Sequence, residues 1–286
     1  MQYQHAFHAG NFADVHKHVA LLALVAQLKK KAKGFLYLDT HAAGGLFDLH
    51  GDEAARAGEW RDGIGRLAGA TPQSPELRDY LDAVRRLRAL PGVGSHDYPG
   101  SPLLAAQALR DVDRGVFVES RAQEARALER ALARLPAAAK LRVEAGDGLA
   151  TLKALLPPLE RRGLVLVDPP YEREDEATLA LDAILGGLAR FDTGVFALWF
   201  PVKRQRDCDL FLARIARTVT RPTLALLLWL HARDTAVGLN GSGLVIVNPP
   251  WQTDTAAALW QEELRTLLGG GPASGSEVTW VIHERR

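Results

Sequence analysis

Short runs of apolar residues alternate along the chain with longer segments in which apolar side chains recur every three or four positions. The runs have the length of strands buried on both faces of a sheet, and the longer segments have the period of amphipathic helices. The first such pair is a helical pattern over residues 11–33, followed by the run 35–39. Asn11 is suited to cap this helix, and Gly34 to end it. The alternation predicts an α/β fold with a mostly parallel sheet.

The same alternation continues from residue 101 to the C-terminal region. Two apolar runs, 224–230 and 243–247, are separated by a segment without a helical period. Strands that are joined without a crossover helix must be antiparallel, so a terminal antiparallel hairpin is expected, with a further edge strand at 277–282. The other expected strands are 115–119, 141–144, 163–168 and 194–200, and the other expected helices are 101–109, 123–135, 149–156, 177–188, 209–217 and 253–267.

Residues 46–98 interrupt this alternation directly after the first strand. The segment contains the pairs Thr71-Pro72 and Ser74-Pro75 and helical patterns around 54–67 and 75–90, and it lacks the period of two that would indicate a strand. We therefore expect a helical insertion subdomain at 46–98, and a core formed by residues 1–45 and 99–286.

Composition narrows the class of protein only slightly. The 286 residues, 47% of them hydrophobic, can bury a substantial core, and no apolar run is long enough to cross a bilayer. A single cysteine and the lack of a signal pattern favour a cytoplasmic protein. The net charge of +1 permits a nucleic-acid partner without requiring one. The sequence has no cysteine pair and no His-Glu-x-x-His motif, so no metal is expected.

Acidic residues follow four of the expected parallel strands. Because the carboxyl ends of parallel strands meet at one edge of a sheet, Asp39, Glu119, Asp147 and Asp168 should lie in one neighbourhood. Carboxylates at such an edge suit a ribose diol and an exocyclic amine, which indicates a ligand that contains a nucleoside. The first loop, residues 40–45, lacks the Gly-x-Gly-x-x-Gly pattern of pyrophosphate sites. A cofactor without phosphates, S-adenosylmethionine, is therefore expected.

The strand that ends at Asp168 is followed by Pro169, Pro170 and Tyr171. The two prolines end the ladder of hydrogen bonds and make the turn rigid. The carboxylate of Asp168 and the carbonyl of Pro169 could accept both hydrogens of an aromatic amine and favour its nucleophilic geometry, while Tyr171 stacks on the base. Taken alone, the motif also fits a strand that prolines end beside an incidental acid. Together with the other acids at this edge, these four residues are the predicted catalytic site, and Tyr171 is also expected to contact the substrate.

A second turn of this kind follows the expected reversed strand and reads Asn248-Pro249-Pro250-Trp251. Because that strand runs the other way, its carboxyl end lies at the opposite edge of the sheet from the acids. We therefore expect a structural role for it.

Several segments together resemble a known family. The turn at Asp168 resembles the Asp/Asn-Pro-Pro-Tyr motif of nucleic-acid methyltransferases that act on amino groups. From residue 3 to about residue 282, the chain also resembles the large-subunit ribosomal RNA adenine-N6 methyltransferase J family. The matching segments are Phe7–Asn11 with Asp14, Lys17 and His18, then Leu38–Ala42, Tyr98–Leu103, Ala197–Trp199 and Asn248–Trp251.

The resemblance implies a Rossmann-like class I methyltransferase fold with seven strands, and methylation of the N6 amine of a specific adenosine in 23S ribosomal RNA. It implies that Asp168 is the catalytic acid and that Tyr3 contacts the RNA. One departure is Ala43, where the family usually has glycine, in a loop that could require a positive φ. The implied ligands of S-adenosylmethionine are His18, His41, Ser101, Glu119, Asp147, Gly148 and Asp168.

Other functions remain open at this point. DNA adenine-N6 and protein glutamine methyltransferases use similar Asp/Asn-Pro-Pro-Tyr turns. A non-catalytic RNA-binding module could retain the same fold, and a nicotinamide dehydrogenase is a more distant alternative. Neither membrane association nor an obligate protein partner is expected.

Overall fold

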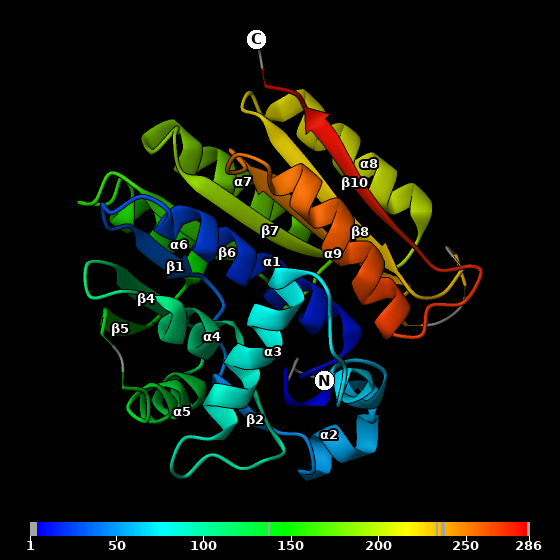
Figure 1. The fold of residues 1–286 in the computed structure, drawn as a ribbon. Helices are drawn as coiled ribbons and strands as arrows, with labels where there is room; N and C mark the ends of the chain where they lie inside the picture. Colours follow the sequence, from blue (N-terminus) through cyan, green and yellow to red (C-terminus); the bar gives the residue numbers. More distant parts are fainter. Residues whose placement is uncertain (1–4, 137, 233, 236–237, 285–286) are drawn as a thin grey trace.

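The computed structural model describes residues 5–136, 138–232, 234–235 and 238–284. A single eight-stranded sheet runs through the molecule in the order β10-β8-β9-β7-β6-β1-β4-β5, and helices cover both of its faces (Figure 1). Within the described ranges, no helix is long and apolar enough to cross a membrane. The strands of this sheet are β1 (Leu36–Asp39), β4 (Arg114–Glu119), β5 (Lys140–Ala145), β6 (Gly163–Val167), β7 (Val195–Val202), β8 (Thr223–Trp229), β9 (Gly241–Val247) and β10 (Gly275–Ile282).

The direction of the strands follows the predicted pattern. The neighbouring strands β5, β4, β1, β6 and β7 run parallel, and β9 is antiparallel to both β7 and β8. The predicted α/β class, the mostly parallel sheet and the terminal hairpin are confirmed. Strand β10 pairs with β8, so the sheet has eight strands, one more than the family resemblance implies.

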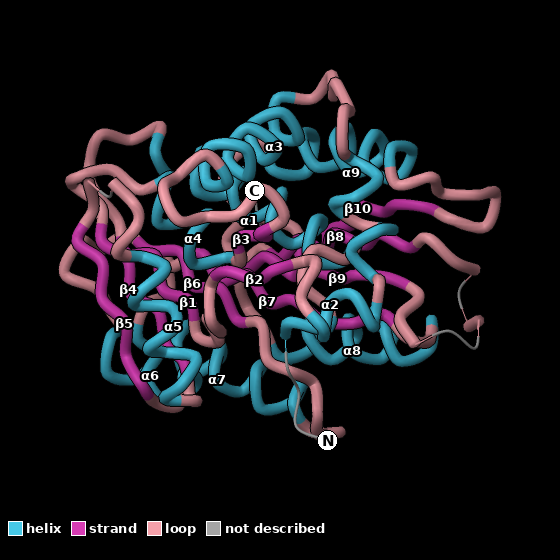
Figure 2. The backbone as a smooth tube through the Cα atoms, turned by 90° about the horizontal axis from the view of Figure 1, so that it is seen from below, coloured by secondary structure: helices cyan, strands magenta, loops and turns pink. Residues whose placement is uncertain are grey.

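The central strand β6 shows why the sheet separates two cores. All of its residues are buried, and successive side chains point to opposite faces. Leu164 and Leu166 pack in one core with α1, α3, α4, α5 and α9, whereas Val165 and Val167 pack in the other with α6, α7 and α8. Figure 2 shows α1, α3 and α9 on one side of the strands and α6, α7 and α8 on the other. An uninterrupted apolar strand therefore indicates burial on both faces.

The first helix carries the cap that the sequence predicts. The side chain of Asn11 accepts a hydrogen bond from the Asp14 amide, and 14 of the 18 residues of α1 are buried. In the part of the chain that the structure describes, the α-helices are α1 (Phe12–Lys29), α2 (Asp52–Ala57), α3 (Pro75–Arg88), α4 (Ser101–Ala108), α5 (Ala122–Leu132), α6 (Gly148–Leu155), α7 (Glu176–Arg190), α8 (Gln205–Thr218) and α9 (Thr253–Leu267), and 3₁₀ helices lie at His5–Phe7, Glu59–Asp62 and Ile64–Leu67.

The segment 46–98 contains two strands that the sequence pattern missed. Strands β2 (Leu46–Asp48) and β3 (Asp97–Pro99) form a separate antiparallel pair in which Leu46 lies opposite Pro99. Three residues are too few to show an alternation, and pairing across some fifty residues is decided by tertiary structure. Between the two strands, the expected helical pattern at 75–90 forms α3, whereas the pattern at 54–67 is divided among the short helix α2 and two 3₁₀ helices. The division into a core and an insertion subdomain stays a prediction.

Asn248 lies at the edge opposite to Asp168, as predicted. Its strand neighbour Val247 pairs with residues at the beginning of β7 and β8. The amide nitrogen Nδ2 of Asn248 donates to the carbonyls of Asp192 and Gly194, each at 2.8 Å, and Asn248 has a φ of +53°. The residue therefore joins the end of β9 to the loop that precedes β7.

We expect Asn248→Ala to lower the free energy of unfolding by about 1–3 kcal/mol, because two hydrogen bonds are lost and alanine tolerates a positive φ poorly. Asn248→Gly is the matched control, since it removes the same amide while it permits the backbone conformation. It should be less destabilised than the alanine variant in urea denaturation. Equal stabilities of both variants and the unaltered protein would contradict a structural role.

Candidate functional site

The predicted acids meet at one edge of the sheet. Asp39 ends β1 and Glu119 ends β4, while Asp168 directly follows β6, which pairs with β1 in parallel. A cleft at this edge is lined by side chains from the N-terminal region, α1, α4 and the ends of these strands. Of the predicted site residues, it brings together His18, His41, Ser101, Glu119, Asp168 and Pro170.

Asp39 lies beneath the cleft and organises its floor. The buried carboxylate accepts hydrogen bonds from the hydroxyls of Tyr37 and Ser101, at 3.0 and 2.7 Å, and from the His41 amide at 3.2 Å. Burial raises the pKa of Asp39 to about 6; the Ser101 hydrogen bond opposes this shift, and the charge of Asp168 adds to it. Asp39 therefore ties α4 to the loop after β1. Both of its carboxylate oxygens are hydrogen-bonded to groups of the protein.

Glu119 is oriented by backbone amides on both sides. Its two carboxylate oxygens accept hydrogen bonds from Ala43 N at 2.9 Å and from Arg121 N at 2.7 Å. Ala43 has a φ of +50°, so the backbone does adopt the left-handed conformation that glycine favours, and its bond to Glu119 holds it there. Oε1 also accepts the Ser120 hydroxyl at 3.3 Å, whereas Oε2 retains a lone pair with which it can accept a hydroxyl of a ribose diol.

Asp147 and Gly148 bring α6 close to the loop after β1. Asp147 Oδ1 caps the helix by accepting the amides of Leu149 and Ala150, at 2.9 and 3.1 Å, which leaves Oδ2 able to accept an exocyclic amine. A Cβ atom on Gly148 would lie 1.8 Å from the carbonyl oxygen of Thr40, so only glycine fits. These features, with the aligned carboxylate of Glu119, fit a nucleoside-containing cofactor.

His18 lies on α1 against residues of β3. Its Nδ1 atom is 2.8 Å from the hydroxyl of Tyr98, which in turn is 3.0 Å from the hydroxyl of Tyr80. Burial lowers the pKa of His18 to about 3, so the imidazole stays neutral at physiological pH. Strand β3 thus connects the segment 46–98 to the cleft.

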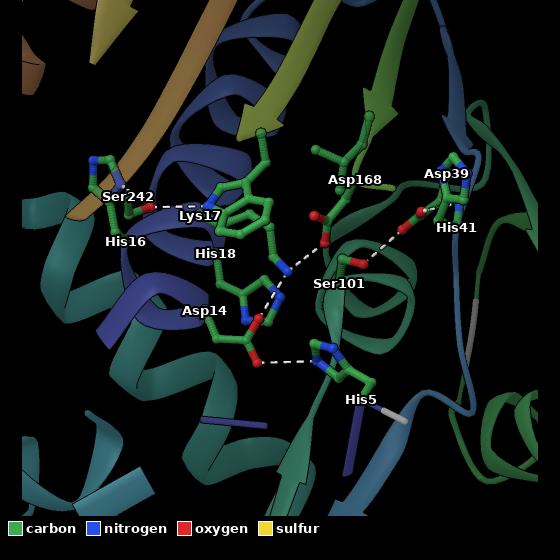
Figure 3. Close-up of polar contacts among 12 residues, drawn as sticks. His5, Asp14, His16, Lys17, His18, Asp39, His41, Ser101, Asp168 and Ser242 are labelled. Carbon is green, nitrogen blue, oxygen red and sulfur yellow. Dashed lines mark hydrogen bonds and ion pairs between the residues drawn. The ribbon is translucent and has the colours of Figure 1, made fainter. Parts of the chain in front are cut away.

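Lys17 lies in a segment that matches the family, but the sequence pattern indicates no role for it. Its ammonium, with a side chain only 4% exposed, lies 2.7 Å from Asp14 Oδ1 and 2.5 Å from Asp168 Oδ2. Asp14 Oδ2 in turn lies 3.1 Å from His5 Nε2 (Figure 3). A lysine at helical spacing from an acid usually forms a surface pair, so sequence alone gave no signal of this burial.

These charges stabilise one another. Burial alone would lower the pKa of Lys17, but the carboxylates of Asp14 and Asp168 raise it above its usual range. Burial would likewise raise the pKa of Asp14, but Lys17, followed by His5, holds it well below its usual range. Lys17 therefore remains charged and engages one oxygen of Asp168, which leaves Oδ1 to accept a hydrogen bond from a ligand.

Tyr171 is held in an uncommon conformation beside this ion pair. It has a φ of +51°, and its hydroxyl donates to the carbonyl of Trp199 at 2.5 Å. The two rings meet edge to face with centroids 5.6 Å apart, and Lys17 Nζ lies 5.8 Å from the centre of the Trp199 ring. Strain of this kind persists only where surrounding contacts impose it.

Tyr3 lies outside the described residues, whereas His5 belongs to the site through Asp14. In the described part of the chain, no group of three His, Cys, Asp or Glu side chains is placed to hold a metal ion.

We expect Asp14→Asn to lower the free energy of unfolding by about 1.5–3 kcal/mol at neutral pH. The depressed pKa of Asp14 adds stability above the unfolded-state pKa, about 4, and this stability is lost as pH falls through the lower folded-state pKa. The difference between the two proteins should therefore shrink in urea denaturation as pH is lowered from 6 towards 2. The exposed pair Asp62–Arg66 provides the control, and Asp62→Asn should change stability by less than about 1 kcal/mol. A difference for Asp14→Asn that grows on acidification would contradict this account.

Comparisons with known proteins agree with the motif resemblance. The family model described as "Ribosomal RNA large subunit methyltransferase D, RlmJ" matches residues 32–282. Ribosomal RNA large subunit methyltransferase J of Haemophilus influenzae is 36% identical over 285 residues, covering 99% of this chain and 100% of that protein. The Escherichia coli protein of the same name is 34% identical over 284 residues, with the same coverage. The crystal structure of protein LPL1258 from Legionella pneumophila is 32% identical and has a TM-score of 0.83, over 96% of this chain and 98% of that one. The chain belongs to the ribosomal RNA large subunit methyltransferase J family.

Proposed function

We propose that this protein transfers the methyl group of S-adenosylmethionine to the N6 amine of a specific adenosine in 23S ribosomal RNA. The observation that carries the proposal is the carboxylate of Asp168, held at one oxygen by a buried lysine and followed by the rigid Pro169-Pro170 turn, at the cleft edge. Family membership supports the methyltransferase activity and the ribosomal RNA substrate. We also propose that it acts in the cytoplasm without an obligate protein partner.

S-adenosylmethionine would supply a methyl group that its sulfonium charge makes electrophilic. Glu119 would accept the ribose hydroxyls and Asp147 the exocyclic amine of the cofactor's adenine, and Gly148 allows α6 to approach the bound nucleoside. The remaining proposed cofactor contacts are His18, His41 and Ser101, which line the cleft with Asp168.

The amine of adenine is a weak nucleophile because its lone pair is delocalised into the ring. Asp168 Oδ1 and the Pro169 carbonyl would accept its two hydrogens and favour a pyramidal nitrogen. The bond between N6 and the methyl carbon would form as the methyl–sulfur bond breaks to leave S-adenosylhomocysteine, and the carboxylate would stabilise the positive charge that develops on N6 until one of its protons passes by way of Asp168 to solvent. Lys17 fixes the carboxylate orientation through Oδ2. Catalysis would then consist chiefly of positioning.

The base must leave its stack to reach this edge, which is easier for an unpaired adenosine in RNA than in a duplex. The Tyr171 ring, anchored at its hydroxyl by Trp199, would stack on the extruded base. Tyr3 is proposed as a further RNA contact.

We expect Asp168→Ala to lower the rate of methyl transfer by at least about 100-fold while the protein stays folded. Methyladenosine in 23S ribosomal RNA should be absent in cells that lack the protein, return with the unaltered chain, and remain absent with Asp168→Ala, as mapped by mass spectrometry. Asp175→Ala, which removes an exposed acid paired with Arg173, is the control and should restore the methylation. Methyl incorporation only into duplex DNA or release factors would contradict the proposal.

We expect Glu119→Gln to weaken binding of S-adenosylhomocysteine by about 10- to 100-fold in calorimetry. The amide would place an NH₂ group against one of the two backbone amides that the carboxylate now accepts. Glu160→Gln is the matched control, since Glu160 pairs with Arg114 at the other end of β4, and it should leave the affinity unchanged. Equal affinities of all three proteins would remove Glu119 from the cofactor site.

A further inference from the structure

A chain of buried hydrogen bonds begins at Trp199 and leads away from the site. Trp199 Nε1 donates to Ser242 Oγ at 2.9 Å, and Ser242 Oγ lies 2.8 Å from His16 Nδ1. His16 Nε2 lies 2.6 Å from Gln261 Oε1, and Gln261 Nε2 donates to the Glu277 carbonyl at 3.4 Å. The contacts of His16 with Ser242 are visible in Figure 3. These hydrogen bonds join β7, β9, α1, α9 and β10. The three middle residues, Ser242, His16 and Gln261, are completely buried.

The direction of every hydrogen bond in this chain is determined by its ends. An indole nitrogen can only donate and a carbonyl can only accept, so Gln261 presents its amide nitrogen to Glu277 and its oxygen to His16. His16 must then donate from Nε2 and, when neutral, accept at Nδ1 from the Ser242 hydroxyl. Burial lowers the pKa of His16 to about 4, against the opposing hydrogen bond of Gln261, which keeps the ring neutral. Only one arrangement satisfies all four hydrogen bonds.

Trp199, whose indole these hydrogen bonds hold, supports two groups of the proposed site. The backbone carbonyl of Trp199 accepts the Tyr171 hydroxyl, its indole ring packs against the Tyr171 ring, and the Lys17 ammonium lies over the same indole. His16 and Lys17 are consecutive residues of α1, so one helix holds Asp168 directly and Trp199 through Ser242. A displaced indole would move both the stacking ring and the cation.

We propose that Ser242 and His16 are positioning residues for methyl transfer, which act by fixing the Trp199 indole and, through it, Tyr171 and Lys17. This inference rests on the proposed function. A fully satisfied buried network adds little net stability over apolar residues of equal shape, but it specifies one orientation. The reacting groups of a transfer that depends on alignment are sensitive to displacements of about 1 Å.

Kinetics of methyl transfer to ribosomal RNA test the inference with Ser242→Ala. We expect kcat to fall about tenfold or more, KM for RNA to change less than about threefold, and affinity for S-adenosylhomocysteine to stay the same, because alignment rather than binding is lost. Ser274→Ala is the matched control; its hydroxyl bonds to Gly271 and Arg265, and the variant should retain full kcat. An unchanged kcat for folded Ser242→Ala would overturn the inference.

A double-mutant cycle separates positioning of the indole from general destabilisation. Trp199→Phe removes the N–H that Ser242 accepts, so adding Ser242→Ala to that variant should lower kcat by less than about twofold. If Ser242→Ala lowers kcat by the same factor in the unaltered protein and in Trp199→Phe, the inference is overturned. If Ser242→Ala does not fold, His16→Gln and His16→Leu replace it. Glutamine can still accept from Ser242 and donate to Gln261, so it should retain more kcat than leucine; equal values would overturn the inference.

Hydrogen exchange of the Trp199 indole N–H gives a readout independent of activity. Its resonance is assigned by its disappearance in Trp199→Phe, and its exchange should be at least about tenfold faster in Ser242→Ala than in the unaltered protein. If the indole N–H exchanges equally slowly in folded Ser242→Ala and in the unaltered protein, the inference about Ser242 is overturned while the proposed function stands. If the unaltered protein transfers no methyl group to ribosomal RNA, the proposed function is contradicted while the hydrogen bonds of Trp199 stand.

Discussion

The rest of the site depends on two buried ion pairs, which the ammonium of Lys17 forms with the carboxylates of Asp14 and Asp168. A buried charge is tolerated only when it is paired, and removal of Lys17 would leave the carboxylates of Asp14 and Asp168 without their shared cation. The ion pair between Lys17 and Asp168 joins the first helix to the end of the central strand, and the contact of His5 with Asp14 connects the N-terminal segment to it. The position of the proposed catalytic carboxylate is therefore set by a helix more than 150 residues away in sequence.

The two halves of the ligand edge are built by different means. In the half formed by β1, β4 and β5, backbone amides orient Glu119, and close packing at Gly148 positions the start of α6. In the half formed by β6 and β7, the side chain of Lys17 orients Asp168, and the carbonyl and ring of Trp199 hold Tyr171. The halves meet where Asp39 and Asp168 repel each other, which contributes to the raised pKa of Asp39. The proposed methyl donor and acceptor would meet at this boundary.

Much of the fold was predictable because the determining signals are local. The uninterrupted apolar run of β6 indicated a strand buried on both faces, and the parallel order then placed Asp39, Glu119 and Asp168 at one edge. The same reasoning placed Asn248 at the opposite edge, where its amide holds the loop before β7. The strands β2 and β3 were missed because a pair of three-residue strands leaves no periodic trace in the sequence.

The sequence by itself determined the order along the chain of the strands in the main sheet, the edge at which the acids gather and the family to which the chain belongs, because periodicity, turn residues and motifs are properties of neighbouring residues. Only the tertiary structure decided which polar side chains are buried together. Lys17 and His16 look like ordinary residues of a first helix, yet one pairs with Asp168 and the other bonds to Ser242 and Gln261. Their burial depends on which face of α1 meets the sheet, and contacts across 151 to 245 residues set that face.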